Sequence, residues 1–229
     1  MSSTPIITVD GPSGSGKGTL ASRIASHLGW HLLDSGALYR IIAVMASRDG
    51  LALLPAEEPT IAELAGELQI EFAGEQVLVA RRADQPSVDL SLEIRTEDVG
   101  VMASKIAVMQ RVRDSVFNLQ RQAAKPPGLV ADGRDMGTYI FPDADFKVFL
   151  DASAEERAQR RYKQLKNKGL SVSLRGLLEQ IEERDARDRE RTIAPLKPAE
   201  DALIIDSTSM SIEAVFDLVM AEASRRDLA

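Results

Sequence analysis

A glycine-rich segment near the start of the chain places the strongest limit on the fold. The segment follows an apolar run at residues 6–9 and precedes a helical pattern at residues 17–28. A strand, a glycine-rich loop with a lysine at this spacing and a helix form the context of a phosphate-binding P-loop. Glycines let backbone N–H groups point inward, and the helix start adds a positive dipole. We therefore predict a nucleoside-triphosphate site at Gly11, Pro12, Ser13, Gly14, Ser15, Gly16, Lys17, Gly18 and Thr19.

Within this loop, Lys17 supplies a full charge for the β- and γ-phosphates. Gly18 stands where a P-loop usually has the Ser or Thr that ligates magnesium, and Thr19 comes one position later. The protein ligands of a metal therefore stay open, although a triphosphate is normally handled with Mg²⁺. A glycine-rich turn without a ligand is the weaker interpretation, and no Gly-x-Gly-x-x-Gly pattern supports a dinucleotide site.

Short apolar runs alternate with amphipathic stretches along the chain. The predicted strands lie at residues 6–9, 31–33, 129–131, 146–150 and 202–205, and the predicted helices at 17–28, 36–48, 104–124, 154–168, 174–189 and 212–226, with Ser211 as an N-cap. Fully apolar strands that alternate with helices are typical of a parallel sheet buried on both faces. We expect an α/β fold, a three-layer sandwich with a five-stranded parallel sheet.

Two features add detail to this scheme. Residues 69–72 and 77–79 read as a hairpin about a turn with Gly74, which indicates a small inserted subdomain at about 53–100. Aspartates follow the predicted strands at positions 10, 34, 132, 151 and 206. The ligand site of an open α/β sheet lies at the carboxyl ends of its strands, although aspartates there also begin turns and cap helices.

Composition excludes several classes of function. The net charge is −7 and aromatic residues make up 4%, which disfavours binding of a nucleic-acid polymer. There is no cysteine, so a disulfide, a thiolate metal site or a cysteine nucleophile is impossible. No apolar run reaches the roughly 20 residues of a membrane helix. We expect a cytoplasmic monomer without a membrane partner.

Arginines are the second sign of phosphate chemistry. Guanidinium groups bind phosphate oxygens bidentately and neutralise the charge of phosphoryl transfer. Arg184, Asp188 and Arg191 have the spacing of one helix face. That face is either part of a binding site or a surface ladder of ion pairs. The Asn-Lys-x-Asp guanine motif of GTPase switches is missing, because Gly169 and Leu170 follow Asn167-Lys168.

The full set of motifs resembles the bacterial cytidylate kinase family, from Ile6 to the C-terminal helix. Besides the loop at 11–19, the resemblance rests on Leu-Leu-Asp-Ser-Gly-Ala-Leu-Tyr-Arg (32–40), Ala-Asp-Gly-Arg-Asp-Met-Gly-Thr (131–138), Phe-Leu-Asp-Ala-Ser (149–153) with Glu-Glu-Arg (155–157), and Arg-Asp-Ala-Arg-Asp-Arg-Glu-Arg (184–191). It implies a P-loop kinase core at 1–35, 101–156 and 171–229. A nucleoside-monophosphate-binding region would lie at about 36–100, with a small antiparallel sheet, and a short lid at about 157–170.

The resemblance also implies residue roles. Residues that would hold the CMP phosphate are Ser35, Arg40, Arg134 and Arg191; those that would read cytosine are Ser104, Arg113 and Asp135; those that would bind the ribose are Arg184 and Asp188. Arg157 and its neighbours would close over ATP, and the catalytic set would be Lys17, Arg134, Arg157 and Arg191. From chemistry alone, a carboxylate such as Asp135 accepts from the exocyclic amine of cytosine and meets a carbonyl in uracil.

The expected reaction is in-line transfer of the γ-phosphate from ATP with Mg²⁺ to CMP or dCMP. It needs positioning and charge stabilisation rather than a strong base. A P-loop kinase for UMP, dTMP or another small acceptor is the alternative within this class. A nucleotide-dependent regulatory module is the alternative from a different class.

Overall fold

The computed structural model describes residues 4–73, 76–167 and 169–229. The chain forms two compact units. The first unit comprises the chain up to Asp34 together with Arg121–Ala229, and the second comprises Ser35–Gln120. Each unit is built around a hydrophobic cluster of its own.

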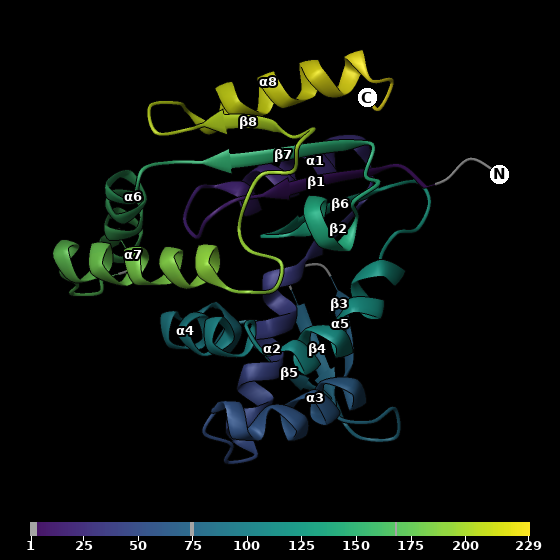
Figure 1. The fold of residues 1–229 in the computed structure, drawn as a ribbon, viewed down its shortest axis with the longest axis vertical. Helices are drawn as coiled ribbons and strands as arrows, with labels where there is room; N and C mark the ends of the chain where they lie inside the picture. The colour runs from purple at the N-terminus through teal and green to yellow at the C-terminus, as the bar shows by residue number, and fades with distance from the viewer. Residues whose placement is uncertain (1–3, 74–75, 168) are drawn as a thin grey trace. The chain divides into compact units, whose positions relative to one another are not determined.

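A five-stranded parallel sheet forms the centre of the first unit (Figure 1). Its strands are β1 (Ile6–Asp10), β2 (His31–Asp34), β6 (Leu129–Gly133), β7 (Phe146–Asp151) and β8 (Leu203–Asp206), in the order β2-β6-β1-β7-β8. In the register of β1, Val9 lies beside Asp132 of β6 and Val148 of β7. The predicted α/β fold and its five strands are confirmed.

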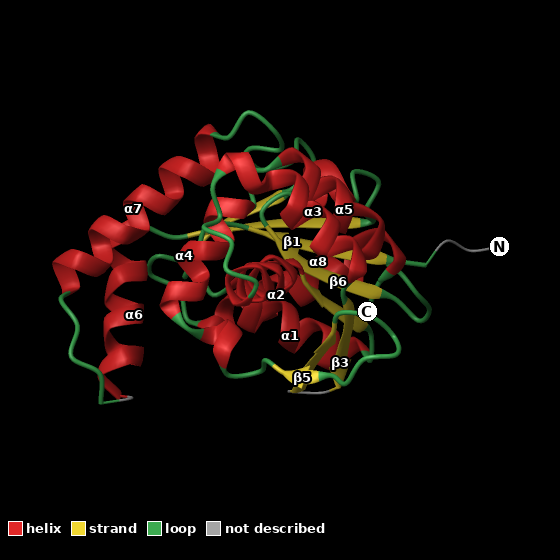
Figure 2. Cartoon of the chain, turned by 90° about the horizontal axis from the view of Figure 1, so that it is seen from below, coloured by secondary structure: helices red, strands yellow, loops and turns green. Residues whose placement is uncertain are grey.

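Helices of the first unit follow the predicted amphipathic segments. They are α1 (Lys17–Leu28), α6 (Ala154–Asn167), α7 (Leu174–Glu190) and α8 (Ile212–Arg225), with a π-helical turn η3 (Met136–Ile140) after β6. Leu20 and Ile24 of α1 and Val219 of α8 have the spacing of buried helix faces and pack with Ile7 and Val9 in one core. Helices α6 and α7 lie side by side (Figure 2).

The second unit combines helices with a small antiparallel sheet. It contains α2 (Ser35–Arg48), a 3₁₀ turn η1 (Pro55–Glu57), α3 (Glu58–Glu67), β3 (Gln69–Ala73), β4 (Gln76–Ala80), β5 (Val88–Asp89), a 3₁₀ turn η2 (Glu93–Arg95), α4 (Glu97–Ile106) and most of α5 (Gln110–Gln122). Ile41, Ile61, Ile106 and Val112 are fully buried in its core. The predicted hairpin is confirmed as β3 and β4. Residues 74 and 75 of its turn lie outside the described residues. Strand β5 is too short to give a sequence signal.

The segment predicted as one helix at 104–124 is wrong in its boundaries. Helix α4 begins earlier, where the Thr96 hydroxyl accepts a hydrogen bond from the Val99 N–H at 3.4 Å, and ends at Ile106. Helix α5 starts afresh at Gln110. No glycine or proline marks the break, so burial of Met109 in the core outweighs the continuous helical pattern. Residues 101–120, which the family resemblance implies to be part of the kinase core, pack in the second unit.

The predicted helix at 154–168 forms as α6 up to Asn167, and Lys168 lies outside the described residues. Among the described residues, no helix has both the length and the apolar character required to cross a bilayer.

The N-cap of α8 gives a direct stability test. The Ser211 hydroxyl accepts a hydrogen bond from the Ala214 N–H at 3.1 Å, as predicted for a cap. Ser211→Ala should lower the free energy of unfolding by about 0.5–2 kcal/mol, because a helix-end N–H loses its partner. Urea denaturation measures this change. Ser224→Ala, at an exposed position near the end of the same helix, is the control, and an equal loss in both variants would contradict the capping role.

Candidate active site

The glycine-rich loop joins the carboxyl end of β1 to the first turn of α1. Gly16 precedes the helix with φ of 95° and ψ of 1°, a left-handed conformation that strains any residue with a side chain. The first turn of α1 contains no acidic residue. Its free N–H groups and helix dipole therefore favour an anion at this end of the helix.

Lys17 and Asp132 face each other beside this loop. The Lys17 Nζ donates to the Pro12 carbonyl at 3.4 Å and lies 3.8 Å from Oδ1 of Asp132, and both side chains are only 11% exposed. Burial, followed by the charge of Arg134, lowers the pKa of Lys17. Burial raises the pKa of Asp132, although the ammonium of Lys17 opposes this. The pair is a weakly solvated charge centre, where electrostatic interactions with a phosphate are strong.

The guanidinium of Arg157 connects the glycine-rich loop to α7. Its Nε donates to the Ala152 carbonyl at 2.9 Å, and its Nη1 donates to the Ser13 carbonyl at 3.0 Å. It also forms a two-pronged pair with Asp185 at 3.1 and 2.5 Å. The side chain is 2% exposed. The sequence gives no sign of this role for Asp185, because the residue lies in a run of acidic and basic residues at 182–191.

A second charged cluster lies at the start of η3 and the end of α7. The Arg134 Nε donates to Oδ2 of Asp188 at 2.9 Å, and Asp135 pairs with Arg191 at 3.5 Å. Burial acts against the charge of Asp188, but the charges of Arg134 and Arg184 outweigh it and lower the pKa of this carboxyl group. The structure therefore brings together all five of the predicted acceptor-binding residues that belong to the first unit.

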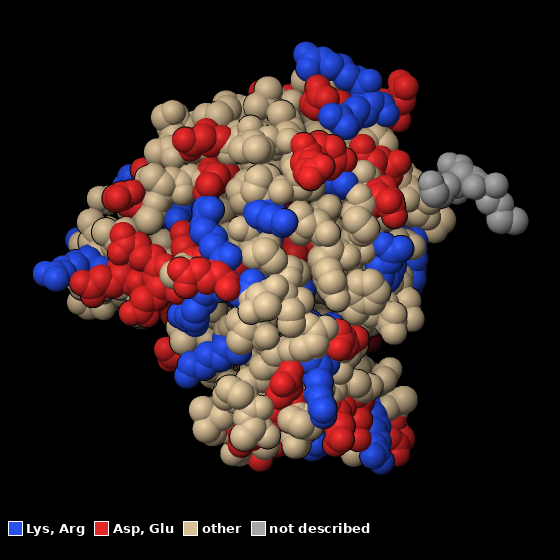
Figure 3. Space-filling view, in the orientation of Figure 1, with Lys and Arg blue, Asp and Glu red and all other residues tan. Residues whose placement is uncertain are grey.

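The shared helix face predicted for Arg184, Asp188 and Arg191 is correct only in part. Helix α7 ends at Glu190, and Arg191 has the extended φ and ψ of −60° and 136°. Its Nε donates to the Ala194 carbonyl at 2.5 Å. Asp188 is 6% exposed and pairs with an arginine from another element, which is inconsistent with a solvated ladder on α7. Acidic side chains instead gather on the outer surface of this helix (Figure 3), where Glu182 and Glu183 are exposed.

Four predicted site residues belong to the second unit. Ser35, the first residue of α2, is buried, and the Arg40 Nη1 on the same helix donates to the carbonyls of Ile94 at 2.6 Å and Thr96 at 3.0 Å. Ser104 is buried inside α4, so it does not cap a helix. The buried Arg113 of α5 donates to the Ala107 carbonyl at the end of α4, at 3.4 Å. Buried polar and charged side chains are stable only when they form hydrogen bonds or ion pairs.

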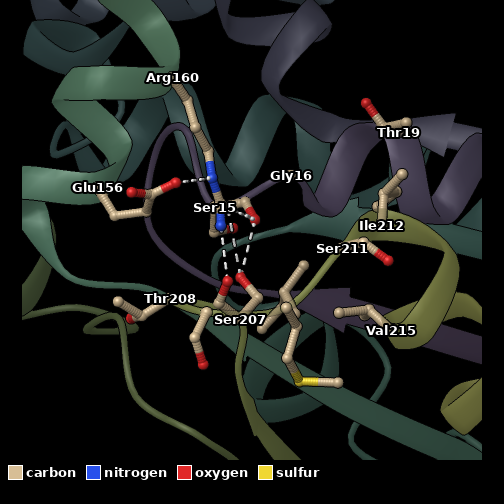
Figure 4. A pocket seen from close by; sticks show the side chains of 13 residues that line it. Ser15, Gly16, Thr19, Glu156, Arg160, Ser207, Thr208, Ser211, Ile212 and Val215 are labelled. Atoms are coloured by element: carbon tan, nitrogen blue, oxygen red, sulfur yellow. Dashed lines mark hydrogen bonds and ion pairs between the residues drawn. The ribbon is translucent and has the colours of Figure 1, made fainter.

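A pocket of about 520 Å³ lies next to the glycine-rich loop in the first unit (Figure 4). Arg160 forms one wall, where its Nε donates to Glu156 at 3.0 Å and its Nη2 to the Ser207 carbonyl at 2.6 Å. The remaining lining is Ser15, Gly16, Thr19, Leu150, Thr208, Ser209, Met210, Ser211, Ile212 and Val215. Ser15, Gly16 and Thr19 belong to the predicted glycine-rich loop, but no sequence pattern predicted the pocket itself. Its only signal is the polar segment after the strand that ends at Asp206.

Asp10, the last residue of β1, is buried directly before the loop. Its Oδ1 accepts from the Met136 N–H and its Oδ2 from the Gly137 N–H, both at 2.8 Å. Burial raises the pKa of Asp10 to about 7, although the two backbone hydrogen bonds lower it. The sequence placed this residue at the site edge without a role.

A phosphate-binding loop at the carboxyl edge of a parallel sheet, beside buried arginines, defines a P-loop phosphotransferase. A family model described as cytidylate kinase matches residues 7–225, and the chain belongs to the cytidylate kinase family. It is similar to the cytidylate kinases of Aeromonas salmonicida, at 54% identity over 97% of this chain and 95% of the relative, and of Pseudomonas fluorescens Pf-5, at 51% over 98% and 97%. A solved gluconokinase from Sinorhizobium meliloti is 14% identical with a TM-score of 0.46, over 98% of this chain and 94% of that one.

The buried pair of Arg134 and Asp188 generates a stability prediction. Asp188→Ala should lower the free energy of unfolding by about 3 kcal/mol without any ligand, because Arg134 keeps a buried charge and loses its partner. Glu179→Ala is the matched control, since Glu179 pairs with Arg175 on the exposed side of the same helix. That change should cost at most about 1 kcal/mol. Chemical denaturation of both variants measures the difference, and equal losses would contradict the role of burial.

Proposed function

We propose that this protein transfers the γ-phosphate of ATP to CMP and dCMP and forms ADP with CDP or dCDP. The observation that carries the proposal is the buried cluster of Arg134, Asp188, Asp135 and Arg191 in the same unit as the glycine-rich loop. The charges of Arg134 and Arg184 act on Lys17. One unit thus offers cationic groups for a triphosphate and for a second anion.

The donor is proposed to bind with its triphosphate on residues 11–19. Lys17 neutralises charge on the β- and γ-phosphates, and the N–H groups at the start of α1 bind their oxygens. The pocket beside the loop would take the adenosine, because its volume and its mixed lining of Met210, Ile212 and hydroxyl groups suit a purine. Arg157 lies against the Ser13 carbonyl and is proposed to stabilise charge at the donor phosphates.

The acceptor is proposed to bind through both charged and polar groups. Ser35, Arg40, Arg134 and Arg191 would hold the CMP phosphate, and Arg184 and Asp188 the ribose. Ser104, Arg113 and Asp135 would read cytosine. A carboxylate that accepts from the cytosine amine would face a carbonyl in uracil, and such a buried mismatch discriminates strongly.

The chemistry proposed is a single in-line displacement. An oxygen of the CMP phosphate forms a bond to the γ-phosphorus while the bond from that phosphorus to the β–γ bridging oxygen breaks, and ADP leaves. The acceptor oxygen is already anionic, so no strong base is required. The arginines and Lys17 bring two anions into line and stabilise the charge of the transferring group. Closure of a lid at about 157–170 and of a monophosphate-binding region at about 36–100 would exclude water.

Mg²⁺ is proposed to accompany ATP. Asp132 fits such an ion, because its buried Oδ1 accepts no hydrogen bond among the described residues and its Oδ2 lies 3.1 Å from where a side chain at Gly18 would begin. In the described part of the chain, no three carboxylate or histidine ligands meet in one place. Mg²⁺ keeps several waters and binds one or two carboxylates together with substrate phosphates, so a single carboxylate such as Asp132 is compatible with it. When bound, the ion would neutralise charge on the phosphates.

Three further proposals concern the oligomeric state, the location and the partners of the enzyme. We propose that it acts as a monomer in the cytoplasm on small nucleotides, without a nucleic-acid polymer or a membrane as partner. The net charge of −7 supports the absence of a polyanionic partner.

A panel of monophosphates tests the acceptor. With saturating ATP and Mg²⁺, CMP and dCMP should give kcat/KM values at least on the order of 100-fold above UMP and dTMP, because the polar edge of cytosine is read. Release of ADP, coupled to NADH oxidation, measures each rate. A tenfold preference for UMP would exclude the proposed role of Asp135. ATP binding without any acceptor-dependent ADP release would favour a regulatory module.

The lowered pKa of Lys17, about 8, predicts an early loss of ATP affinity with rising pH. The ammonium binds phosphate only when protonated, so wild-type affinity should fall above pH 8, by at most about tenfold per pH unit. Lys17→Ala should bind ATP more weakly at pH 7 and show little further change up to pH 9.5. Isothermal titration measures both proteins. Lys125→Ala, an exposed lysine before the amino end of β6, is the control, and parallel pH curves for Lys17→Ala and wild type would contradict the assignment.

A further inference from the structure

The carboxylate of Asp10 connects the strand before the glycine-rich loop to the turn after β6. Its two oxygens each accept one backbone hydrogen bond of 2.8 Å, from Met136 and from Gly137. Asp10 is 4% exposed, and both contacts are buried. The next residue, Gly11, begins the glycine-rich loop. A single side chain therefore supports two segments that are proposed to bind different substrates.

The two anchored N–H groups belong to the first residues of η3. A helix start leaves its N–H groups without partners inside the helix, and a buried N–H group requires one. Asp10 provides both partners from a neighbouring strand. The position of this turn is therefore determined by β1 rather than by the turn itself.

Asp135 lies directly before the anchored residues and has an irregular backbone. Its φ and ψ are −146° and 22°, outside the helical and extended ranges. Its carbonyl accepts from the Tyr139 N–H at 2.9 Å and the Ile140 N–H at 3.1 Å. The direction of its side chain thus depends on how the turn is held, and the side chain meets Arg191 at 3.5 Å.

Close packing against Thr8 and Lys147 limits how far the backbone of this turn can move. A Cβ atom on Gly137 would lie 2.8 Å from Oγ1 of Thr8 and 3.2 Å from Cδ of Lys147. The turn therefore packs tightly against β1 and β7, and a side chain at position 137 would displace it. A small displacement of this backbone would move Asp135 and Arg134 together.

We propose that Asp10 is a positioning residue for acceptor selection, because it holds the Met136 and Gly137 N–H groups and so directs the side chain of Asp135. This inference rests on the proposed function, in which Asp135 reads the cytosine base. Asp10 itself contacts no substrate in this scheme. Its loss should therefore affect recognition of the acceptor base more than binding of ATP.

Asp10→Asn is the most informative variant, because it keeps the size of the side chain. The amide oxygen still accepts one hydrogen bond, but the amide NH₂ meets the second N–H group and cannot accept from it. We expect KM for CMP to rise on the order of tenfold and the ratio of kcat/KM for CMP over UMP to fall on the order of fivefold or more. KM for ATP should stay within about twofold of wild type, because the variant is not expected to weaken the binding of both substrates equally.

Asp145→Asn is the matched control. The Asp145 Oδ2 also accepts a backbone hydrogen bond at one end of β1, from the Ile6 N–H at 2.8 Å, but at the opposite end and on the surface. Its kinetic constants should equal those of wild type. Lower thermal stability of Asp10→Asn with unchanged KM for CMP and unchanged base selection would overturn the proposal. Equal rises in both KM values would overturn it as well.

Gly137→Ala provides a second test if Asp10→Asn does not fold. It displaces the same turn through the Thr8 contact without replacing any carboxylate. The same rise in KM for CMP and the same loss of base selection support the proposal, whereas wild-type selectivity in this variant overturns it. Absence of CMP turnover by the wild-type enzyme would instead contradict the proposed function, and the inference would fall with it.

Discussion

Parallel pairing of the five strands of the first unit is the constraint on which the site depends. Because all neighbouring strands run in the same direction, their carboxyl ends meet at one edge of the sheet. Asp10, Asp34, Asp132, Asp151 and Asp206 all lie at the last or next-to-last positions of these strands. Several acidic groups thus gather beside a loop that is suited to bind an anion, and cationic groups are needed between them.

Lys17 and the buried arginines provide that compensation. Lys17 lies between the loop and Asp132, Arg134 pairs with Asp188, and Arg157 pairs with Asp185. Each buried charge is held by a partner from a different element, which fixes the position of both partners. The ion pairs that allow the first unit to bury these charges therefore also fix the positions of Lys17, Arg134 and Arg157.

The fold followed from the sequence wherever local patterns decide it. The five strands, the glycine-rich loop and the cap at Ser211 all have a signal within a few residues. The break between α4 and α5 does not, because it depends on the packing of Met109 in the core of the second unit. Strand β5, with two residues, also forms only through its partner β4.

The candidate site divides in the same way. The glycine-rich loop is a contiguous motif that a single sequence reveals, and the family resemblance names Arg134 and Asp188; the roles of these residues stay predictions. The pocket bounded by Arg160 and Ser207, and the contact of Asp185 with Arg157, join residues that are 28 to 47 positions apart in the chain. A single sequence gives no distance information of that kind. Asp10 was visible as a residue at a strand end, but its two hydrogen-bond donors lie more than 120 positions away.

The reciprocal burial of Arg134 and Asp188 restricts the routes by which this sequence can change. Replacement of either residue alone leaves its partner charged in a poorly solvated place, so an intermediate with one change is less stable than either end point. Over evolution, Arg134 and Asp188 are therefore expected either to be replaced together or to be retained together. The exposed glutamates of α7 can be replaced one at a time.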